Sequence, residues 1–189
     1  MNQKNKIFTI PNLLSCFRIC LIPLIIWLYC VQENNVVTAL ILILSGLTDV
    51  VDGFIARRFH TISNLGKMLD PVADKATQGA MLFCLITRYP TMLQPLSLLV
   101  IKEAFVGATS LIVIKKTGNV IGADWHGKIT TCLLYIMMIL HVLWHDMPLD
   151  VSDTLIDVCV IMMVISMVLY GVRNLSAVKS KEKKGRIML

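Results

Sequence analysis

Charged side chains are scarce in this sequence. They make up 16% of its 189 residues, whereas a soluble domain usually contains about a quarter. Apolar residues account for 56% of the chain, and the mean hydropathy is +0.73. This composition excludes an ordinary soluble domain, and we therefore expect an integral membrane protein.

Paired cysteine motifs are also missing. The cysteines lie inside or at the ends of apolar runs, and none forms a C-x-x-C pair. This excludes a disulfide framework and a cysteine-bound zinc, so we interpret these residues as small apolar side chains that pack in the interior. They are Cys16, Cys20, Cys30, Cys84, Cys132 and Cys159. The first apolar run has no small-residue cleavage site after it, and we interpret it as a retained membrane span rather than a signal peptide.

Six apolar runs have about the 20 residues that a membrane helix needs. The predicted spans lie near residues 13–31, 36–57, 67–88, 92–115, 128–145 and 152–172. The links between them are short, so consecutive helices should pack antiparallel. We predict an all-α fold: one domain of residues 1–189, with a bundle of six transmembrane helices and a short amino-terminal interfacial helix at about 6–12.

Lysine and arginine are unevenly distributed between the two sides of the predicted membrane. One side collects Lys4, Lys6, Arg57, Arg58, Lys67, Lys115, Lys116, Lys128 and a basic tail at about 173–189. The other side has Arg88 as its basic residue. Basic residues favour the cytoplasm, so we predict a multi-pass protein of a bacterial cell (inner) membrane, with both termini and the loops after the second and fourth spans in the cytoplasm. This placement explains most of the net charge of +6 without a nucleic-acid partner.

Four aspartates interrupt the second and third spans: Asp49, Asp52, Asp70 and Asp74. A charged residue inside a membrane helix costs about 2.5–3.5 kcal/mol on insertion scales, so something must offset them. Each pair is spaced three or four residues apart and shares one helix face, and both pairs lie near the predicted cytoplasmic surface. Carboxylate oxygens suit Mg²⁺, Mn²⁺ or Ca²⁺ better than zinc, and bound metal would let them hold a diphosphate.

Small residues and a cation accompany these acids. Gly53, Ala56 and Gly66 let the backbone approach a ligand closely, and Arg57 can pair with a phosphate. Close helix packing is the alternative explanation for Gly53 and Ala56, although it leaves the neighbouring acids unexplained.

The stretch from Asp49 to Asp74 resembles the signature of the CDP-alcohol phosphotransferase family (CDP-alcohol phosphatidyltransferase class I). The family pattern is D-x-x-D-G-x-x-A-R, eight residues, then G-x-x-x-D-x-x-x-D, and all eight fixed positions match. The resemblance implies transfer of a phosphatidyl group from CDP-diacylglycerol to an alcohol acceptor, with release of CMP. It also implies a homodimer in the lipid bilayer.

The resemblance assigns roles to the motif residues. Asp49, Asp52 and Asp70 would coordinate one or two Mg²⁺ or Mn²⁺ ions, with Asp74 completing a second metal site. Asp74 would also be the general base for the acceptor hydroxyl. The residues expected to bind the CDP moiety are Asp49, Asp52, Gly53, Ala56, Arg57, Gly66 and Asp70.

The acceptor is predicted from residues around the motif. The segments 9–18 and 63–71 are similar to those of phosphatidylglycerophosphate synthases, which implies glycerol 3-phosphate. Its phosphate needs cations, and the candidates are Lys102, Lys128 and Arg18. Each has a structural alternative: an ion pair with an acid for Lys102, an interfacial anchor for Lys128, and a side chain that snorkels to the surface for Arg18.

One departure from the synthase pattern keeps a second acceptor open. Phosphatidylglycerophosphate synthases tend to have Gly-Lys-x-Lys-Thr where this chain has Gly127-Lys128-Ile129-Thr130-Thr131, so the second lysine is absent. A cardiolipin synthase of the same family, with phosphatidylglycerol as acceptor, is therefore the alternative.

A divalent metal-ion transporter is the alternative from another class. It would need acids along a route to both membrane surfaces, whereas these four lie near one. The histidines His60 and His126 are interpreted as solvated loop residues.

Overall fold

The computed structural model describes the backbone of residues 10–59, 66–118 and 125–187, and the side chains of residues 12–48, 51, 69–118 and 125–178. The described backbone consists of helices joined by short turns, with no strand, which confirms the all-α prediction. The helices are α1 (Ile10–Cys30), α2 (Asn35–Phe59), α3 (Gly66–Ile86), the short 3-10 helix η2 (Pro90–Met92), α4 (Leu93–Thr117), α5 (Trp125–Leu143) and α6 (Leu149–Ile187). The predicted interfacial helix at about 6–12 lies mostly outside the described residues.

Polar and glycine residues set the helix ends. The side-chain oxygen of Asn34 accepts a hydrogen bond from the backbone N–H of Val37 at 3.1 Å, which caps the start of α2. At the end of α4, Gly118 has φ 73° and its N–H bonds to the carbonyl of Ile114 at 2.8 Å. Glycine adopts this left-handed conformation without strain. The predicted boundaries of the second and fourth spans lie within a few residues of the ends of α2 and α4.

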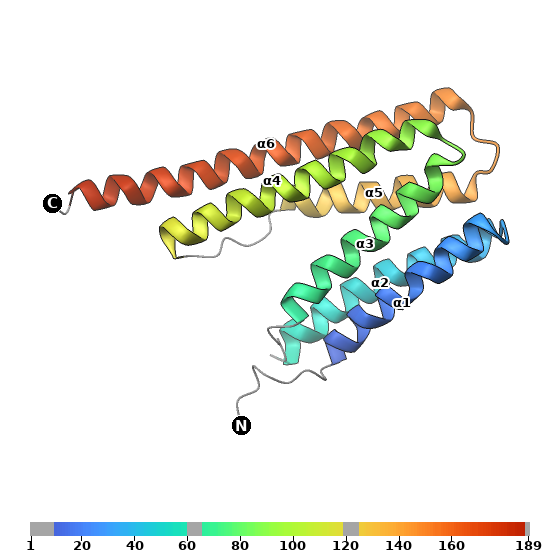
Figure 1. Ribbon diagram of the computed structural model, residues 1–189, viewed down its shortest axis with the longest axis horizontal. Helices are drawn as coiled ribbons and strands as arrows, with labels where there is room; N and C mark the ends of the chain where they lie inside the picture. The colour runs from blue at the N-terminus through green and yellow to red at the C-terminus, as the bar shows by residue number, and fades with distance from the viewer. Residues whose placement is uncertain (1–9, 60–65, 119–124, 188–189) are drawn as a thin grey trace. The chain divides into compact units, whose positions relative to one another are not determined.

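The chain forms two compact units. Unit 1 comprises Met1–Met92 and Tyr135–Pro148, and unit 2 comprises Leu93–Leu134 and Leu149–Leu189, so α5 contributes to both. In unit 1, α1 packs along α2 and α3, and the apolar part of its core includes Leu42, Met81, Leu82 and Leu85, which have no exposed surface. The chain reverses between α1 and α2 and again between α2 and α3, so the start of α1, the end of α2 and the start of α3 lie at one end of the unit (Figure 1).

Unit 2 is built on α4 and α6, which lie side by side and run in the same direction (Figure 1). The amide of Asn174 donates a hydrogen bond to the hydroxyl of Thr109 at 2.9 Å, which joins the two helices. Nearby, the absence of a side chain at Gly171 lets the Phe105 ring approach closely. The first part of α5 adds buried side chains to this unit, among them Leu134.

Four segments are long and apolar enough to cross a membrane: Asn12–Cys30, Pro90–Thr117, Trp125–Leu143 and Leu149–Val178. α2 contributes a shorter apolar stretch, Asn35–Thr48. α2 and α3 do not meet the same test within the described residues, and they are the two helices that carry the motif aspartates. Large apolar side chains such as Phe83 and Val100 are more than 60% exposed, as expected for a lipid-facing surface.

The last helix is longer than the predicted sixth span. α6 contains 39 residues and continues to Ile187. The basic segment that begins at about residue 173 is therefore the continuation of the same helix rather than a separate tail.

Candidate functional site

Asp74 lies in the first half of α3, and side chains from α3 and α5 contact its carboxylate within the described part of the chain. The amide nitrogen of Gln78, one turn later on α3, donates to both oxygens, at 3.2 Å and 3.1 Å. The Tyr135 hydroxyl, from α5, donates to Oδ1 at 3.1 Å. The Lys75 ammonium lies 3.7 Å from Oδ2. These contacts from two helices fix the orientation of the carboxylate.

Asp70 lies one turn before Asp74 and pairs with a cation from another helix. The guanidinium of Arg18, on α1, donates to its Oδ1 and forms a salt bridge with it. The Arg18 side chain is completely buried, whereas 39% of the Asp70 side chain is exposed. Arg18 therefore does not snorkel to the surface, because a buried guanidinium needs the paired carboxylate.

Two of these contacts are not evident from the motif. Gln78 follows Asp74 by four residues, so its position on the same helix face was recognisable from helical spacing. Tyr135 is 61 residues from Asp74, and no local pattern marks it. Buried tyrosines usually satisfy their hydroxyl group, but a sequence does not say with which partner.

The remaining motif residues lie on α2 and at the start of α3. Asp49, Asp52, Gly53, Ala56 and Arg57 are in the second half of α2, and Gly66 is the first residue of α3. Their side chains lie outside the described part of the structure. The convergence of all four carboxylates therefore stays a prediction, although the two helix segments that carry them lie at the same end of unit 1 (Figure 1).

The donor atoms at this end suit a hard divalent cation. Among the described residues, no three histidines, cysteines or acids lie together as a metal site, and the side chains of Asp49 and Asp52 are outside that set. The Gln78 amide oxygen is buried without a hydrogen-bond partner and belongs to the side chain that contacts Asp74. Carboxylate and amide oxygens are the ligands that Mg²⁺ and Mn²⁺ prefer.

The candidate acceptor residues are divided between the two units. Arg18 belongs to unit 1, whereas Lys102 and Lys128 belong to unit 2. Lys102 is buried and lies 3.5 Å from the carboxylate of Glu103, as expected for an ion pair within a span. Lys128 is exposed on α5, as expected for an interfacial anchor. The structure thus brings Arg18 to the Asp70 carboxylate of α3.

His126 is not the solvated loop residue that we predicted. It lies at the start of α5 with 6% of its surface exposed. Its Nδ1 is 3.1 Å from the Ser166 hydroxyl, and its ring packs edge-on against Tyr170 at 4.5 Å between centroids. The error arose because the predicted span began at residue 128, whereas the helix begins at Trp125. His60 lies outside the described residues.

Comparison with known proteins identifies the family. The model of the CDP-alcohol phosphatidyltransferase family matches residues 8–172. A CDP-diacylglycerol–glycerol-3-phosphate 3-phosphatidyltransferase of Bacillus subtilis is 28% identical over 92% of this chain and 98% of its own length. Two proteins named as cardiolipin synthases match shorter parts of this chain. A cardiolipin synthase (CMP-forming)/mitochondrial hydrolase fusion protein of Schizosaccharomyces pombe is 37% identical over 59% of this chain, which spans 19% of that protein. A cardiolipin synthase (CMP-forming) of Streptomyces coelicolor is 42% identical over 39% of this chain and 36% of its own length.

Proposed function

The chain belongs to the CDP-alcohol phosphatidyltransferase family, and on this premise we propose that it transfers the phosphatidyl group of CDP-diacylglycerol to glycerol 3-phosphate and releases CMP. The observation that carries the proposal is the arrangement of Asp70 and Asp74 on one face of α3, at the end of unit 1 where α2 brings the rest of the motif. The similarity to the Bacillus subtilis enzyme over nearly its whole length supports glycerol 3-phosphate as the acceptor.

Asp74 is the general base in this proposal. Its carboxylate takes the proton from the acceptor hydroxyl as the hydroxyl oxygen attacks the phosphorus on the diacylglycerol side. A new P–O bond forms to the acceptor, the P–O bond to CMP breaks, and CMP leaves with the electron pair of that bond. Gln78 and Tyr135 hold the Asp74 carboxylate in one orientation for this transfer.

Asp49, Asp52 and Asp70, with Asp74, are the proposed ligands of one or two divalent cations. A bound Mg²⁺ or Mn²⁺ would supply positive charge that neutralises the phosphate oxygens of CDP-diacylglycerol. The buried Gln78 amide oxygen is a further donor of suitable type. Arg18 contributes a fixed positive charge beside Asp70, which limits repulsion between the carboxylates before substrate binds.

The CDP moiety and the acceptor need further groups. Gly53, Ala56, Arg57 and Gly66 are proposed to line the CDP site with Asp49, Asp52 and Asp70. Lys102 and Lys128, with Arg18, are the proposed cations for the acceptor phosphate. We place this site at the cytoplasmic surface of a multi-pass inner-membrane protein and expect a homodimer.

Phosphatidylglycerol is the second candidate acceptor, and the product would then be cardiolipin. Similarity to two proteins named as cardiolipin synthases supports it, as does the single lysine in Gly127–Thr131. Both reactions would use the same motif aspartates, because the acceptor changes while the phosphatidyl donor and the leaving CMP remain the same.

A product assay tests both acceptors. Purified protein receives CDP-diacylglycerol and Mg²⁺ or Mn²⁺, together with glycerol 3-phosphate, phosphatidylglycerol, inositol phosphate or serine. We expect CMP and a new lipid phosphate with glycerol 3-phosphate, and no CMP after EDTA. Cardiolipin formed from phosphatidylglycerol would select the second candidate, and a lack of CMP with every acceptor would overturn the enzyme proposal.

Replacing the base tests the role of Asp74. Asp74→Asn keeps the size of the side chain but removes its ability to accept a proton, so we expect CMP release to fall by about 10²- to 10⁴-fold. Asp153→Asn is the matched control, because Asp153 is an exposed residue on α6. The melting temperature in detergent shows whether each variant is folded. Near-normal turnover by a folded Asp74→Asn protein would exclude Asp74 as the base.

A further inference from the structure

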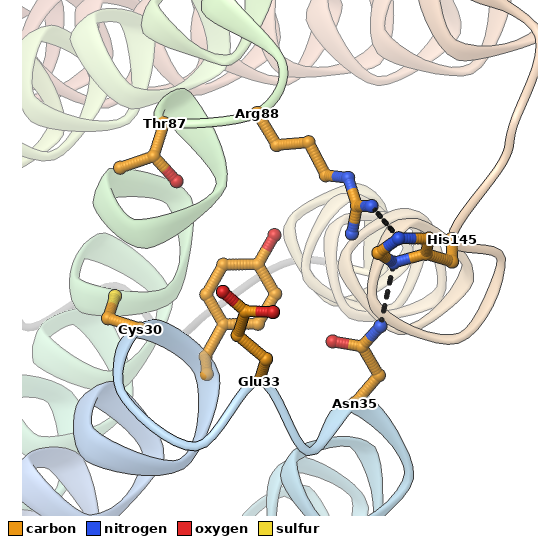
Figure 2. A pocket seen from close by; sticks show the side chains of 7 residues that line it. Cys30, Glu33, Asn35, Thr87, Arg88 and His145 are labelled. Atoms are coloured by element: carbon orange, nitrogen blue, oxygen red, sulfur yellow. Dashed lines mark hydrogen bonds between the residues drawn. The ribbon is translucent and has the colours of Figure 1, made fainter.

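Unit 1 contains a cavity of about 290 Å³ at the end opposite Asp70 and Asp74. It is lined by Tyr29, Cys30, Glu33, Asn35, Thr87, Arg88 and His145. These residues come from the end of α1, the start of α2, the segment after α3 and the segment after α5 (Figure 2). Asp70 and Ile86 are 16 residues apart on α3, or roughly 24 Å along the helix, so the cavity is remote from the proposed catalytic residues.

Arg88 supplies positive charge to this cavity. One of its guanidinium nitrogens contacts Nε2 of His145, and Nδ1 of His145 lies 3.2 Å from the Asn35 amide (Figure 2). A guanidinium only donates hydrogen bonds, so Nε2 must be the acceptor and Nδ1 carries the proton. The contact between His145 and Asn35 joins Nδ1 to the Asn35 amide nitrogen. Arg88 is thus held by a neutral imidazole, and no carboxylate among the described residues forms an ion pair with it.

Two further polar groups, from Tyr29 and Glu33, line the cavity beside Arg88. Tyr29 is 7% exposed, and its hydroxyl lies beside the Arg88 guanidinium, which interacts with it. The Glu33 carboxylate points into the space framed by Thr87, Arg88 and His145 (Figure 2), and Glu33 holds a φ of 50°.

The surroundings of the cavity indicate the edge of a lipid bilayer. Cys30 is the last residue of the apolar segment Asn12–Cys30. Trp27 and Trp144, on the two elements that supply Cys30 and His145, are about half exposed. Exposed tryptophans are enriched where membrane meets water. A ligand that reaches this cavity from the membrane would therefore enter with its headgroup.

We propose that this cavity binds the phosphoethanolamine headgroup of a membrane lipid. The Arg88 guanidinium pairs with the phosphate, to which the Tyr29 hydroxyl also donates, and the Glu33 carboxylate pairs with the ammonium group. A simple anion would meet repulsion from Glu33, and a simple cation would meet repulsion from Arg88. A ligand with both charges satisfies both residues. A volume of about 290 Å³ accommodates a headgroup but leaves the acyl chains outside, along the apolar surface of α1.

Direct lipid binding tests the proposal without relying on the enzymatic activity. Full-length protein, delipidated in a non-ionic detergent, is titrated with phosphatidylethanolamine, phosphatidylglycerol and phosphatidylcholine of identical acyl chains. Native mass spectrometry reports the bound lipids. We expect one phosphatidylethanolamine per chain, bound at least about tenfold more tightly than the other two lipids. Soluble glycerophosphoethanolamine should displace it, whereas inorganic phosphate at equal concentration should not.

Substitutions at two positions, Arg88 and Glu33, identify the groups responsible. Arg88→Gln should weaken phosphatidylethanolamine binding about tenfold or more, and Arg88→Lys should weaken it less. Glu33→Gln should abolish the preference for phosphatidylethanolamine over phosphatidylglycerol. The control is Lys115→Gln, which removes an exposed cation at the end of α4. CMP release should be unchanged in all four variants, which confirms that they are folded.

The proposal fails if the three lipids bind equally to the unaltered protein, or if inorganic phosphate displaces phosphatidylethanolamine as well as the soluble headgroup does. It also fails if folded Glu33→Gln keeps the original preference. Should Arg88→Gln not fold, Glu33→Gln decides the question, because Glu33 is exposed and its side chain forms no hydrogen bond within the described structure.

Discussion

The orientation of the Asp74 carboxylate depends on donors from two helices. Tyr135 reaches it from α5, and Gln78 reaches it from the next turn of α3. A hydrogen bond to a charged group contributes about 1.5–3 kcal/mol, and Gln78 and Lys75 remain when the tyrosine hydroxyl is removed. We expect Tyr135→Phe to lower kcat about tenfold, which corresponds to ~1.4 kcal/mol, without changing KM for the acceptor.

Tyr89→Phe is the matched control for this prediction. Tyr89 is another tyrosine of unit 1; it is buried and packs against His141 instead of Asp74. Steady-state CMP release over a range of acceptor concentrations separates kcat from KM. If Tyr135→Phe raised KM and left kcat unchanged, the hydroxyl would serve acceptor binding rather than the position of the base.

Single residues differ in how far the sequence determines their role. The motif aspartates were recognisable because the cost of charge inside a span demands an explanation and because their spacing is regular. Arg18 was recognised as a cation but not as the partner of Asp70, which is 52 residues away. Such contacts depend on how helices pack against one another, and local spacing carries no information about them.

At the level of helices, the start of α5 packs closely against α6. A Cβ added at Gly127 would clash with the Tyr170 hydroxyl and would lie 3.2 Å from the ring carbon that bears it. The ring has little freedom to move, since His126 packs against it and the Arg173 guanidinium lies 4.9 Å from its centroid. Glycine at position 127 therefore permits the close approach of the two helices.

We expect Gly127→Ala to destabilise the protein by about 1–3 kcal/mol, as overpacking usually does. Thermal unfolding in detergent should show a drop of about 2–4 °C per kcal/mol. Adding Tyr170→Phe should recover part of the loss, because it removes the nearest atom. Gly107→Ala is the control, since nothing lies within 4 Å of its added Cβ. Equal stability of Gly127→Ala and Gly107→Ala would contradict the proposed steric role of Gly127.

The boundaries of α5 and α6 show what hydropathy alone leaves out. The predicted fifth span began at 128, yet Trp125 and His126 are helical, because a polar or aromatic first turn adds little to an apolar average. The predicted sixth span ended at 172, yet α6 continues to Ile187. Lysine and glutamate are good helix formers, similar to leucine. A helix can therefore continue after its sequence has stopped being apolar.

At the scale of the whole molecule, the number of membrane crossings depends on α2 and α3. α2 and α3 have 25 and 21 residues, or about 38 and 32 Å, enough for a hydrocarbon core of about 30 Å. They are less apolar than the four segments that are long and apolar enough to cross a membrane, because they carry the motif acids. Four and six crossings both leave the two termini on the same side, so the location of the termini does not distinguish them.

The link between α2 and α3 distinguishes the two arrangements. With six crossings, residues 60–65 face the cytoplasm together with both termini, whereas with four crossings they face outward. We expect six, because the proposed site needs access to a cytoplasmic CDP-lipid headgroup and acceptor. In a cysteine-free variant that retains CMP release, Ser63→Cys should resist a membrane-impermeant thiol reagent in intact cells and react after permeabilisation. Gln32→Cys, in the link after α1, should react in intact cells in either arrangement, and Ser180→Cys should not. Labelling of Ser63→Cys from outside would establish four crossings and move the motif aspartates to the opposite surface.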